Sequence, residues 1–304
     1  MNPGWRVIDC TDFDGTLSYS RGQLEVNSES SLTELPLTQL AVVLIGIHTR
    51  ISGATLAKLS EYDVAVLVCD WRNVPVAGAL PWREHTRIGA RHIAQARASQ
   101  PKQKQAWAAL VTAKICGQAH AARAITNAQH KDLDRLALTV RSGDTTNVEA
   151  RAARLYWSSI TDFSFKRLPR MRIDPFNSAL DYGYTVLRGI GIRAVTSAGL
   201  SSALGVFHRG RNNPFNLVDD LMEPFRPMVD QIVFTQLELE DQLDKAGKHT
   251  IVETLTTVPF NAKGQTVSTV FEDLAQTYGQ YVEGQLDRFV PQAWEGELSA
   301  PKWS

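Results

Sequence analysis

The sequence predicts an α+β fold, with a β-rich amino-terminal domain over residues 1–84 and a mostly α-helical domain over residues 85–304. Its 304 residues exceed the size at which one hydrophobic core usually stops growing, so we expect two cores. Short apolar runs of strand length dominate before Pro81. The chain after Pro81 is rich in Ala, Gln, Lys and Arg, with apolar residues at helical spacing.

The first domain opens with two short alternating segments, WRVIDC and GQLEV, which predict a hairpin or meander. Leu40 to Ile47 and Val64 to Cys69 are apolar runs of strand length. The segment between them carries Leu56 and Leu59 at helical spacing. This pattern predicts a strand, helix, strand unit.

A basic segment joins the two domains, and its composition predicts a linker helix over residues 85–105. Arg83, Arg87 and Arg91 recur every fourth residue and therefore share one helix face. This face is either solvated or turned toward phosphates. At the other end of the chain, residues 290–304 are expected to form a flexible tail.

The overall composition is that of an ordinary folded protein, with 43% hydrophobic and 21% charged residues. Lys plus Arg equals Asp plus Glu at 32 each, so any basic binding surface must be local. Cys10, Cys69 and Cys116 are too far apart for a Cys-x-x-Cys site, and we interpret them as small core residues in a reducing compartment. The start of the chain does not resemble a signal peptide, and no apolar run reaches the ~18 residues of a membrane span. We therefore expect a cytoplasmic protein.

The stretch DFDGTLS, Asp12 to Ser18, matches the nucleophile loop of haloacid dehalogenase-like phosphohydrolases. Such an enzyme needs its nucleophilic aspartate at the carboxyl end of a buried parallel strand. The preceding RVIDCT carries three polar or charged residues and suits a half-exposed strand instead. Since Asp and Gly are also ordinary turn residues, a structural turn is the favoured interpretation. A phosphohydrolase that uses Asp12 and Asp14 remains the alternative.

A helix beginning near Asn216 carries the most informative pattern. Its buried stripe would consist of Val218, Leu221, Met222, Phe225, Val229 and Ile232. At about 100° per residue, one flank would carry Asp219, Glu223, Arg226 and Asp230, while Asp220 points elsewhere. Pro224 and Pro227 remove backbone hydrogen bonds, which predicts a kink beside this acidic flank.

Two further residues could join the acidic flank. His208 precedes the short connection RGRNNP, which can bring its ring beside Glu223. The alternative is a satisfied core histidine beside a solvated acidic face. Glu149 is the third acid, but Thr146 to Glu149 also matches a capping box, which would explain the glutamate as a helix cap.

Several segments resemble the CRISPR-associated protein 1 family, the integrase subunit that inserts new spacers into CRISPR arrays. They are AVLVCDWRNVPVAGALP, VEARAARLYW, NSALDYGYTVLRGI and GLSSALGVFHRGRNNPFNLVDDLMEPFRP. The resemblance covers nearly the whole chain. The EPFRP form of the helix that begins near Asn216 is most like members from type II systems. DFDGTLS falls where the family has a turn between its first strands.

The resemblance implies a β-rich domain that dimerises and a helical catalytic domain. It also implies a divalent metal held by Glu149, His208 and Glu223. Asp219 or Asp220 could be a further ligand, and helical geometry favours Asp219. Two carboxylates and one imidazole with open positions suit Mg²⁺ or Mn²⁺. The implied activity, in CRISPR adaptation and antiviral defence, is attack of a DNA 3′ hydroxyl on repeat phosphodiesters. With water as the nucleophile, the same site is an endonuclease.

The implied partners are double-stranded DNA, as prespacer fragment and CRISPR repeat, and two homodimers of this chain bridged by a dimer of CRISPR-associated protein 2. Other type II acquisition proteins could join them. The candidate phosphate contacts are Arg209, Arg211, Arg226, Lys166, Arg167, Arg170 and Arg172. Tyr156 and Tyr184 could stack on bases, although core roles are favoured. A non-catalytic DNA-binding scaffold of the same fold is the second alternative.

Overall fold

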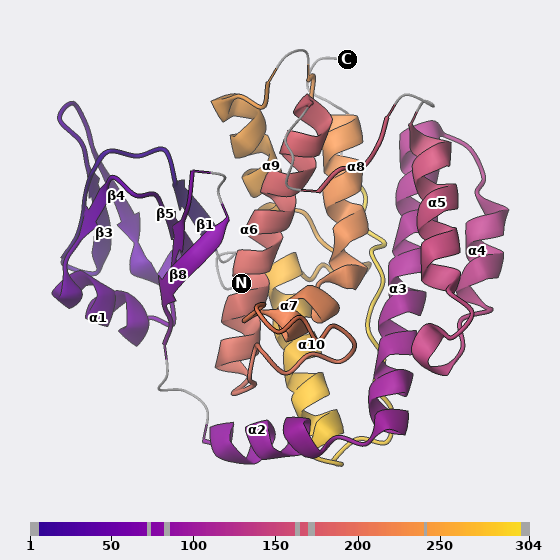
Figure 1. Cartoon of the computed structure of the whole chain (residues 1–304). Helices are drawn as coiled ribbons and strands as arrows, with labels where there is room; N and C mark the ends of the chain where they lie inside the picture. Colours follow the sequence, from indigo (N-terminus) through magenta and orange to yellow (C-terminus); the bar gives the residue numbers. More distant parts are fainter. Residues whose placement is uncertain are drawn as a thin grey trace.

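The computed structural model describes residues 6–71, 74–81, 86–161, 165–169, 174–239 and 242–298. The β-rich part lies to one side of the helical part, as the indigo strands and the magenta to yellow helices of Figure 1 show. This is the predicted α+β arrangement. The predicted boundary between residues 84 and 85 falls outside the described residues.

The strands are β1 (Arg6–Cys10), β2 (Gly15–Ser20), β3 (Gln23–Asn27), β4 (Leu32–Pro36), β5 (Leu40–Ile45), β6 (Thr49–Ile51), β7 (Ala65–Cys69) and β8 (Pro75–Ala79). The α-helices are α1 (Gly53–Glu61), α2 (Ile88–Arg97), α3 (Gln100–Thr126), α4 (Lys131–Ala137), α5 (Val148–Ile160), α6 (Pro175–Ser197), α7 (Asn216–Leu221), α8 (Arg226–Gln236), α9 (Lys245–Thr257) and α10 (Val267–Val282). The 3₁₀ turns are η1 (Leu37–Gln39), η2 (Ser142–Asp144) and η3 (Glu223–Phe225).

The strands form two four-stranded sheets, in the orders β1-β5-β7-β8 and β4-β3-β2-β6. The predicted strand, helix, strand unit is β5, α1 and β7, whose two strands are parallel. The predicted meander exists as β2, β3 and β4, with GQLEV in its middle strand, but WRVIDC is not part of it. β1 pairs in parallel with β5, while β3 forms antiparallel pairs with β2 and β4 in the other sheet.

Strand β5 lies between the two hydrophobic cores. Val43 and Ile45 face the core between the two sheets, whereas Val42 and Leu44 belong to the larger core that continues into the helices. Successive side chains of a strand point to opposite faces, so covering both faces requires an unbroken apolar run. Helix α6 packs against this sheet at Gly189, where an added Cβ would lie at an ordinary contact distance of 3.4 Å from Val42.

The segment DFDGTLS forms a turn, as favoured from the sequence. β1 runs parallel to β5, but it is the edge strand of its sheet and ends at Cys10. Asp12 follows in the turn with a side chain 63% exposed, and it forms a 2.5 Å ion pair with Lys248. Asp14 lies at the surface, 3.8 Å from Arg50. Neither carboxylate sits in a buried strand end, which removes the basis for the phosphohydrolase alternative.

Two helices, α2 and α3, occupy the region where one linker helix was predicted over residues 85–105. The chain turns at Ala98 and Ser99, and the Ser99 hydroxyl accepts from the backbone N–H of Lys102 at 3.4 Å. Arg91 does not face solvent or phosphates, because its side chain is buried and Nη1 donates to the carbonyl of Ala198 at 2.5 Å. Arg87 pairs with Glu283 at 2.7 Å, and Arg83 lies outside the described residues.

The carboxyl-terminal segment also differs from expectation. Residues 290–298 are packed against the helices rather than flexible, and 299–304 lie outside the described residues. The Trp294 ring is fully buried beside Phe260, at a centroid distance of 5.5 Å, and its Nε1–H donates to Gln231 Oε1 at 2.7 Å. Cys116 also differs from expectation, since it is exposed while Cys10 and Cys69 are buried. None of the described helices is long and apolar enough to cross a membrane.

Trp294→Ala should destabilise the protein by about 3–5 kcal/mol, because it removes a buried aromatic ring and leaves Gln231 without its donor. The midpoint of urea unfolding measures this loss. Val290→Ala is the matched control, since Val290 is in the same segment and 74% exposed. Equal midpoints for the two variants would contradict the packing of this segment.

Candidate functional site

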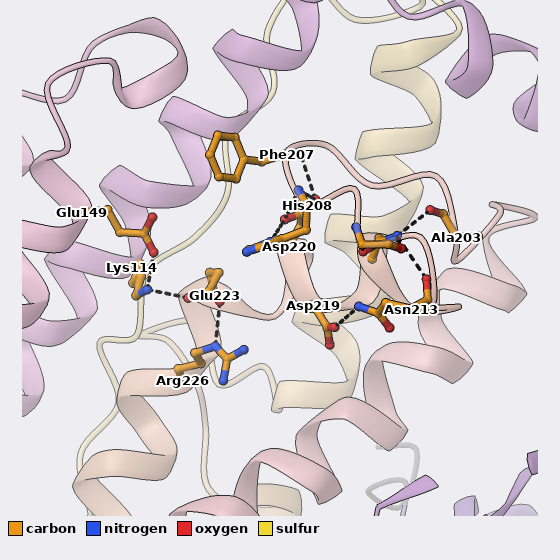
Figure 2. Close-up of polar contacts among 12 residues, drawn as sticks. Lys114, Glu149, Ala203, Phe207, His208, Asn213, Asp219, Asp220, Glu223 and Arg226 are labelled. Atoms are coloured by element: carbon orange, nitrogen blue, oxygen red, sulfur yellow. Dashed lines mark hydrogen bonds and ion pairs between the residues drawn. The ribbon is translucent and has the colours of Figure 1, made fainter. Parts of the chain in front are cut away.

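A cavity of about 560 Å³ opens between α3, α6 and the α7 to α8 region. Its lining includes Lys114, His208, Asp219, Glu223 and Arg226. Figure 2 shows Lys114 of α3 beside Glu223 and Arg226 of the interrupted helix, with His208 on the loop before α7 and Asp219 turned toward Asn213. The predicted acidic flank and the predicted histidine therefore meet in one place.

Two prolines place Glu223. The predicted kinked helix is broken into α7, the 3₁₀ turn η3 and α8, with Pro224 and Pro227 in the first positions of η3 and α8. Proline is tolerated at the start of a helix, where no backbone donor is lost. The predicted apolar stripe is buried throughout. The turn directs the Glu223 carboxylate, only 7% exposed, toward α3.

Glu149 lies in the first turn of α5 and does not cap it. Asp144 has that role, because its two carboxylate oxygens accept from the backbone N–H groups of Val148 at 2.8 Å and Glu149 at 3.0 Å. The capping-box interpretation of Glu149 is therefore wrong. Since Asp144 neutralises the helix end, the Glu149 side chain is available for another partner.

Lys114 of α3 joins the two glutamates. Its Nζ lies 2.6 Å from Glu149 Oε1 and 2.6 Å from Glu223 Oε2. Arg226 completes the group, since its Nε donates to Glu223 Oε1 at 2.8 Å. One ammonium is thus shared by two carboxylates that come from separate helices (Figure 2).

The charges in this group stabilise each other. Burial alone would raise the pKa of Glu223, but Arg226 and Lys114 outweigh it and lower the pKa to about 2. Burial alone would lower the pKa of Lys114, but the attraction of Glu223 and Glu149 raises it. Glu223 therefore stays a carboxylate, and Lys114 an ammonium, at every pH where the protein would work.

Asp220 orients the ring of His208. His208 Nδ1 lies 2.5 Å from Asp220 Oδ1, and Oδ2 accepts from the backbone N–H of Phe207 at 2.8 Å. This hydrogen bond raises the pKa of His208, against the opposing effect of burial. With Nδ1 engaged, Nε2 is the ring nitrogen left for a ligand, which is the usual arrangement behind metal-binding histidines.

The loop around Asp220 leaves no room for a larger residue at Gly205. A Cβ there would lie 2.4 Å from the carbonyl of His208 and 2.9 Å from Asp220 Oδ2. Phe207 ties the same loop to α3, because its ring stacks on Trp107 at a centroid distance of 4.4 Å. His208 packs edge-on against that ring pair. The histidine is therefore fixed in position although its side chain is 49% exposed.

Asp219 is engaged on the other side of α7. Its Oδ2 accepts from Arg188 at 2.8 Å and from the Asn213 side-chain amide at 2.7 Å. Asn216 holds the loop before α7, since its side-chain amide donates to the carbonyls of Gly210 and Asn213. These bonds give the loop RGRNNP a defined shape at the rim of the cavity.

The predicted phosphate contacts divide into two groups. Lys166, Arg209 and Arg211 are exposed, and Arg209 donates to Gln103 at 2.8 Å. Arg167 and Arg226 line the cavity instead, where Arg167 pairs with Asp181 at 2.6 Å. Arg170 and Arg172 lie outside the described residues.

The partly buried Tyr184 and the buried Asp230 form a pair in the cavity wall. The Tyr184 hydroxyl donates to Asp230, and both Arg167 and Arg226 lie over the Tyr184 ring. Burial raises the pKa of Asp230 to about 6, with the hydrogen bonds and the two arginines acting in the opposite direction. Tyr156 is fully buried, in agreement with a core role.

Among the described residues, no three His, Cys, Asp or Glu side chains are arranged as a ready metal site. The donor set nevertheless suits a hard divalent cation. The carboxylates of Glu149 and Glu223 both contact the Lys114 ammonium. Apart from this ion pair, Glu223 Oε2 is buried without a hydrogen-bond partner. The oriented imidazole of His208 lines the same cavity. The Lys114 ammonium stands where such an ion would contact both carboxylates.

The sequence analysis missed Lys114 and Arg188, and it considered Asp220 only as an alternative metal ligand and not as the partner of His208. Lys114 had a usable signal, because it is the one charged residue in the thirteen-residue stretch WAALVTAKICGQA, Trp107 to Ala119. The prediction that Asp220 points away from the acidic flank is correct. Helical spacing could not predict the loop that brings His208 beside Asp220. Arg188 lies on α6, and its pairing with Asp219 depends on how two distant helices pack.

The chain is similar to known proteins in both sequence and fold. The family model described as CRISPR associated protein Cas1 matches residues 10–249. The curated CRISPR-associated endonuclease Cas1 of Neisseria meningitidis serogroup C (strain 8013) is 37% identical over 246 residues, which cover 79% of this chain and 80% of that protein.

Solved structures share the fold. A casposase bound to integration product superposes with a TM-score of 0.75 at 18% identity, covering 94% of this chain and 92% of that one. A Cas6-RT-Cas1–Cas2 complex gives a TM-score of 0.71 at 19% identity, covering 97% of this chain and 36% of that chain. With most of its length matched by the family model, and with a relative at 37% identity, the chain belongs to the Cas1 family, the CRISPR-associated endonucleases and integrases of spacer acquisition.

Proposed function

We propose that Glu149, His208 and Glu223 hold a divalent cation, Mg²⁺ or Mn²⁺, and that this centre joins DNA 3′ ends to repeat phosphodiesters. The supporting observation is the convergence of two carboxylates on one cation beside a histidine whose Nδ1 is held by Asp220. When bound, the metal would supply Lewis acidity at the scissile phosphate. Endonuclease activity follows at the same site when water replaces the 3′ hydroxyl.

The protein's own residues position the reactants. Asp220 engages Nδ1 of His208, which leaves Nε2 as the ring nitrogen for ligand binding. Arg226 neutralises part of the Glu223 charge, which reduces repulsion of an approaching phosphate. Asp219 is held by Arg188 and Asn213, and we assign it to shaping the cavity rather than to the ligand set.

The substrate we propose is double-stranded DNA, both as the prespacer fragment and as the CRISPR repeat. Lys166, Arg209 and Arg211 are exposed cations whose contacts would go to phosphates, which position a duplex without reading its sequence. The net charge of the chain is zero, so this attraction must come from local groups. The fold shared with a casposase bound to integration product is consistent with this substrate.

The assembly we propose is two homodimers of this chain bridged by a dimer of Cas2, with other type II acquisition proteins as further partners, in the prokaryotic cytoplasm where CRISPR arrays lie. The fold shared with a Cas6-RT-Cas1–Cas2 complex supports the Cas2 partner. Exposed Ile47 and Val76 in the β-rich part offer apolar surface for the dimer contact.

His208→Ala should abolish strand transfer, with a loss of at least about 100-fold, because a metal ligand outweighs the supporting groups whose removal costs about 10–100-fold. The assay joins a labelled DNA duplex to a plasmid carrying the cognate repeats, with Cas2 and Mn²⁺. DNA affinity, measured in parallel, should stay nearly unchanged. Equal product from wild type and variant would contradict the ligand assignment. No product from either, with DNA binding retained, would favour a non-catalytic scaffold.

Asp220→Asn should reduce strand transfer by about 10–100-fold, with partial recovery at high Mn²⁺. The amide keeps the size of the side chain, but its NH₂ group cannot accept from the Phe207 backbone N–H. Titration of activity against Mn²⁺ separates weaker metal binding from slower chemistry. An unchanged titration curve would show that Asp220 does not support the metal site.

Replacing Lys166, Arg209 or Arg211 singly by alanine should weaken DNA binding and make the dependence of log affinity on log salt shallower, by ~0.9 for each phosphate that the variant no longer neutralises. Fluorescence anisotropy of a labelled duplex over a salt series measures both quantities. Arg135→Ala is the matched control, because Arg135 is an exposed cation on α4 outside the cavity lining. A slope equal to wild type would exclude that residue from phosphate binding.

A further inference from the structure

Lys114 is a cation placed where the proposed function requires a different cation. We propose that Lys114 is an internal counter-ion that holds Glu149 and Glu223 together until a divalent metal replaces it, and that a DNA phosphate then receives its ammonium. This inference rests on the proposed metal site. It makes metal binding and DNA binding mutually dependent through one side chain.

The contacts of Lys114 point to replacement rather than permanent structure. Its Nζ lies 2.6 Å from one oxygen of each glutamate. Apart from this ion pair, the buried Oε2 of Glu223 has no hydrogen-bond partner, so the oxygen would be open to another ligand once the ammonium leaves. Lysine carries a compact charge on a flexible stem, which can leave a carboxylate more easily than the forked guanidinium of Arg226 can.

The backbone beneath Lys114 is fixed, so its side chain must make the movement. Gly117, one turn further along α3, faces Pro227 of α8, and a Cβ there would lie 3.2 Å from the Pro227 ring. This close contact holds α3 beside the turn that carries Glu223. Lys114 also lines the cavity, so its ammonium can turn from the carboxylates toward a bound phosphate.

Charge balance gives the reason for the exchange. Without a metal, two carboxylates face two cations, Lys114 and Arg226, and the group is neutral. A divalent cation placed between the same carboxylates would repel an ammonium a few ångströms away, and the repulsion is strong where water is scarce. A DNA phosphate offers the displaced ammonium a charge-assisted hydrogen bond. Metal and DNA therefore favour each other's binding, and this coupling must be reciprocal.

Lys114→Met tests the exchange by metal affinity, not by activity. Free Mn²⁺ is measured by electron paramagnetic resonance during titration of the full chain, with and without a short DNA duplex. Without DNA, we expect Lys114→Met to bind Mn²⁺ about tenfold more tightly than wild type, because no ammonium has to leave. DNA should tighten Mn²⁺ binding more in wild type than in Lys114→Met. Lys104→Met is the matched control, since Lys104 is an exposed lysine of the same helix.

Thermal unfolding supplies a second readout. In the presence of a chelator, Lys114→Met should melt below wild type, because the buried Glu223 and the partly buried Glu149 carboxylates then lack their shared cation. Saturating Mn²⁺ should raise its melting temperature by more than it raises that of wild type. Lys114→Gln retains amide donors for the two carboxylates and serves if the methionine variant does not fold.

The titrations also separate this inference from the proposed function. If Glu149→Gln and His208→Ala bind Mn²⁺ as wild type does, the metal site itself is wrongly assigned. If both weaken Mn²⁺ binding while Lys114→Met and Lys114→Gln bind it no more tightly than wild type, the metal site stands and the counter-ion role of Lys114 is overturned.

Discussion

The break in the helix between Met222 and Pro227 is the constraint on which the rest of the site depends. A continuous helix would present Asp219 and Glu223 on one flank at similar depth. The two prolines instead end α7, create the turn η3 and restart the chain as α8. Asp220 then faces the histidine loop, Asp219 faces α6, and Glu223 faces α3. Three acids close in sequence thus acquire three different partners.

Burial and charge are balanced around this break. The ionised carboxylate of Glu223 is nearly inaccessible to water, which is costly unless cations lie beside it. Lys114 and Arg226 supply them, one from a neighbouring helix and one from the next turn. The histidine follows the same pattern, because buried Asp220 has its charge satisfied by an imidazole and two backbone N–H groups. The site is therefore held together by pairs of opposite charges in a poorly solvated region.

The sequence predicted the parts of this structure that follow from periodicity and from the family resemblance. The stripe through Val218 and Ile232, the strand run of β5, and the meeting of His208 with Glu223 in one cavity all agree with the structure. Long-range packing was not predictable in the same way. The buried Arg91, the pairing of β1 with β5 and the position of Lys114 each depend on residues from elements far apart in the chain. The capping box at Glu149 failed for a local reason, since Asp144 competes for the same backbone donors.

The carboxyl-terminal segment packs against Gly117, which lies one turn after Lys114 on α3. A Cβ added at Gly117 would lie 3.3 Å from Trp294 Cβ and 3.2 Å from the Pro227 ring. The indole of Trp294 also donates a hydrogen bond to Gln231 of α8. Translation releases the chain from the amino terminus, so α3 and α8 emerge from the ribosome well before Trp294 does. The packing of Trp294 against α3 and α8 is therefore added after those two helices have left the ribosome. A nascent chain therefore carries all the proposed ligands before the Trp294 side chain has packed beside Gly117 and Gln231.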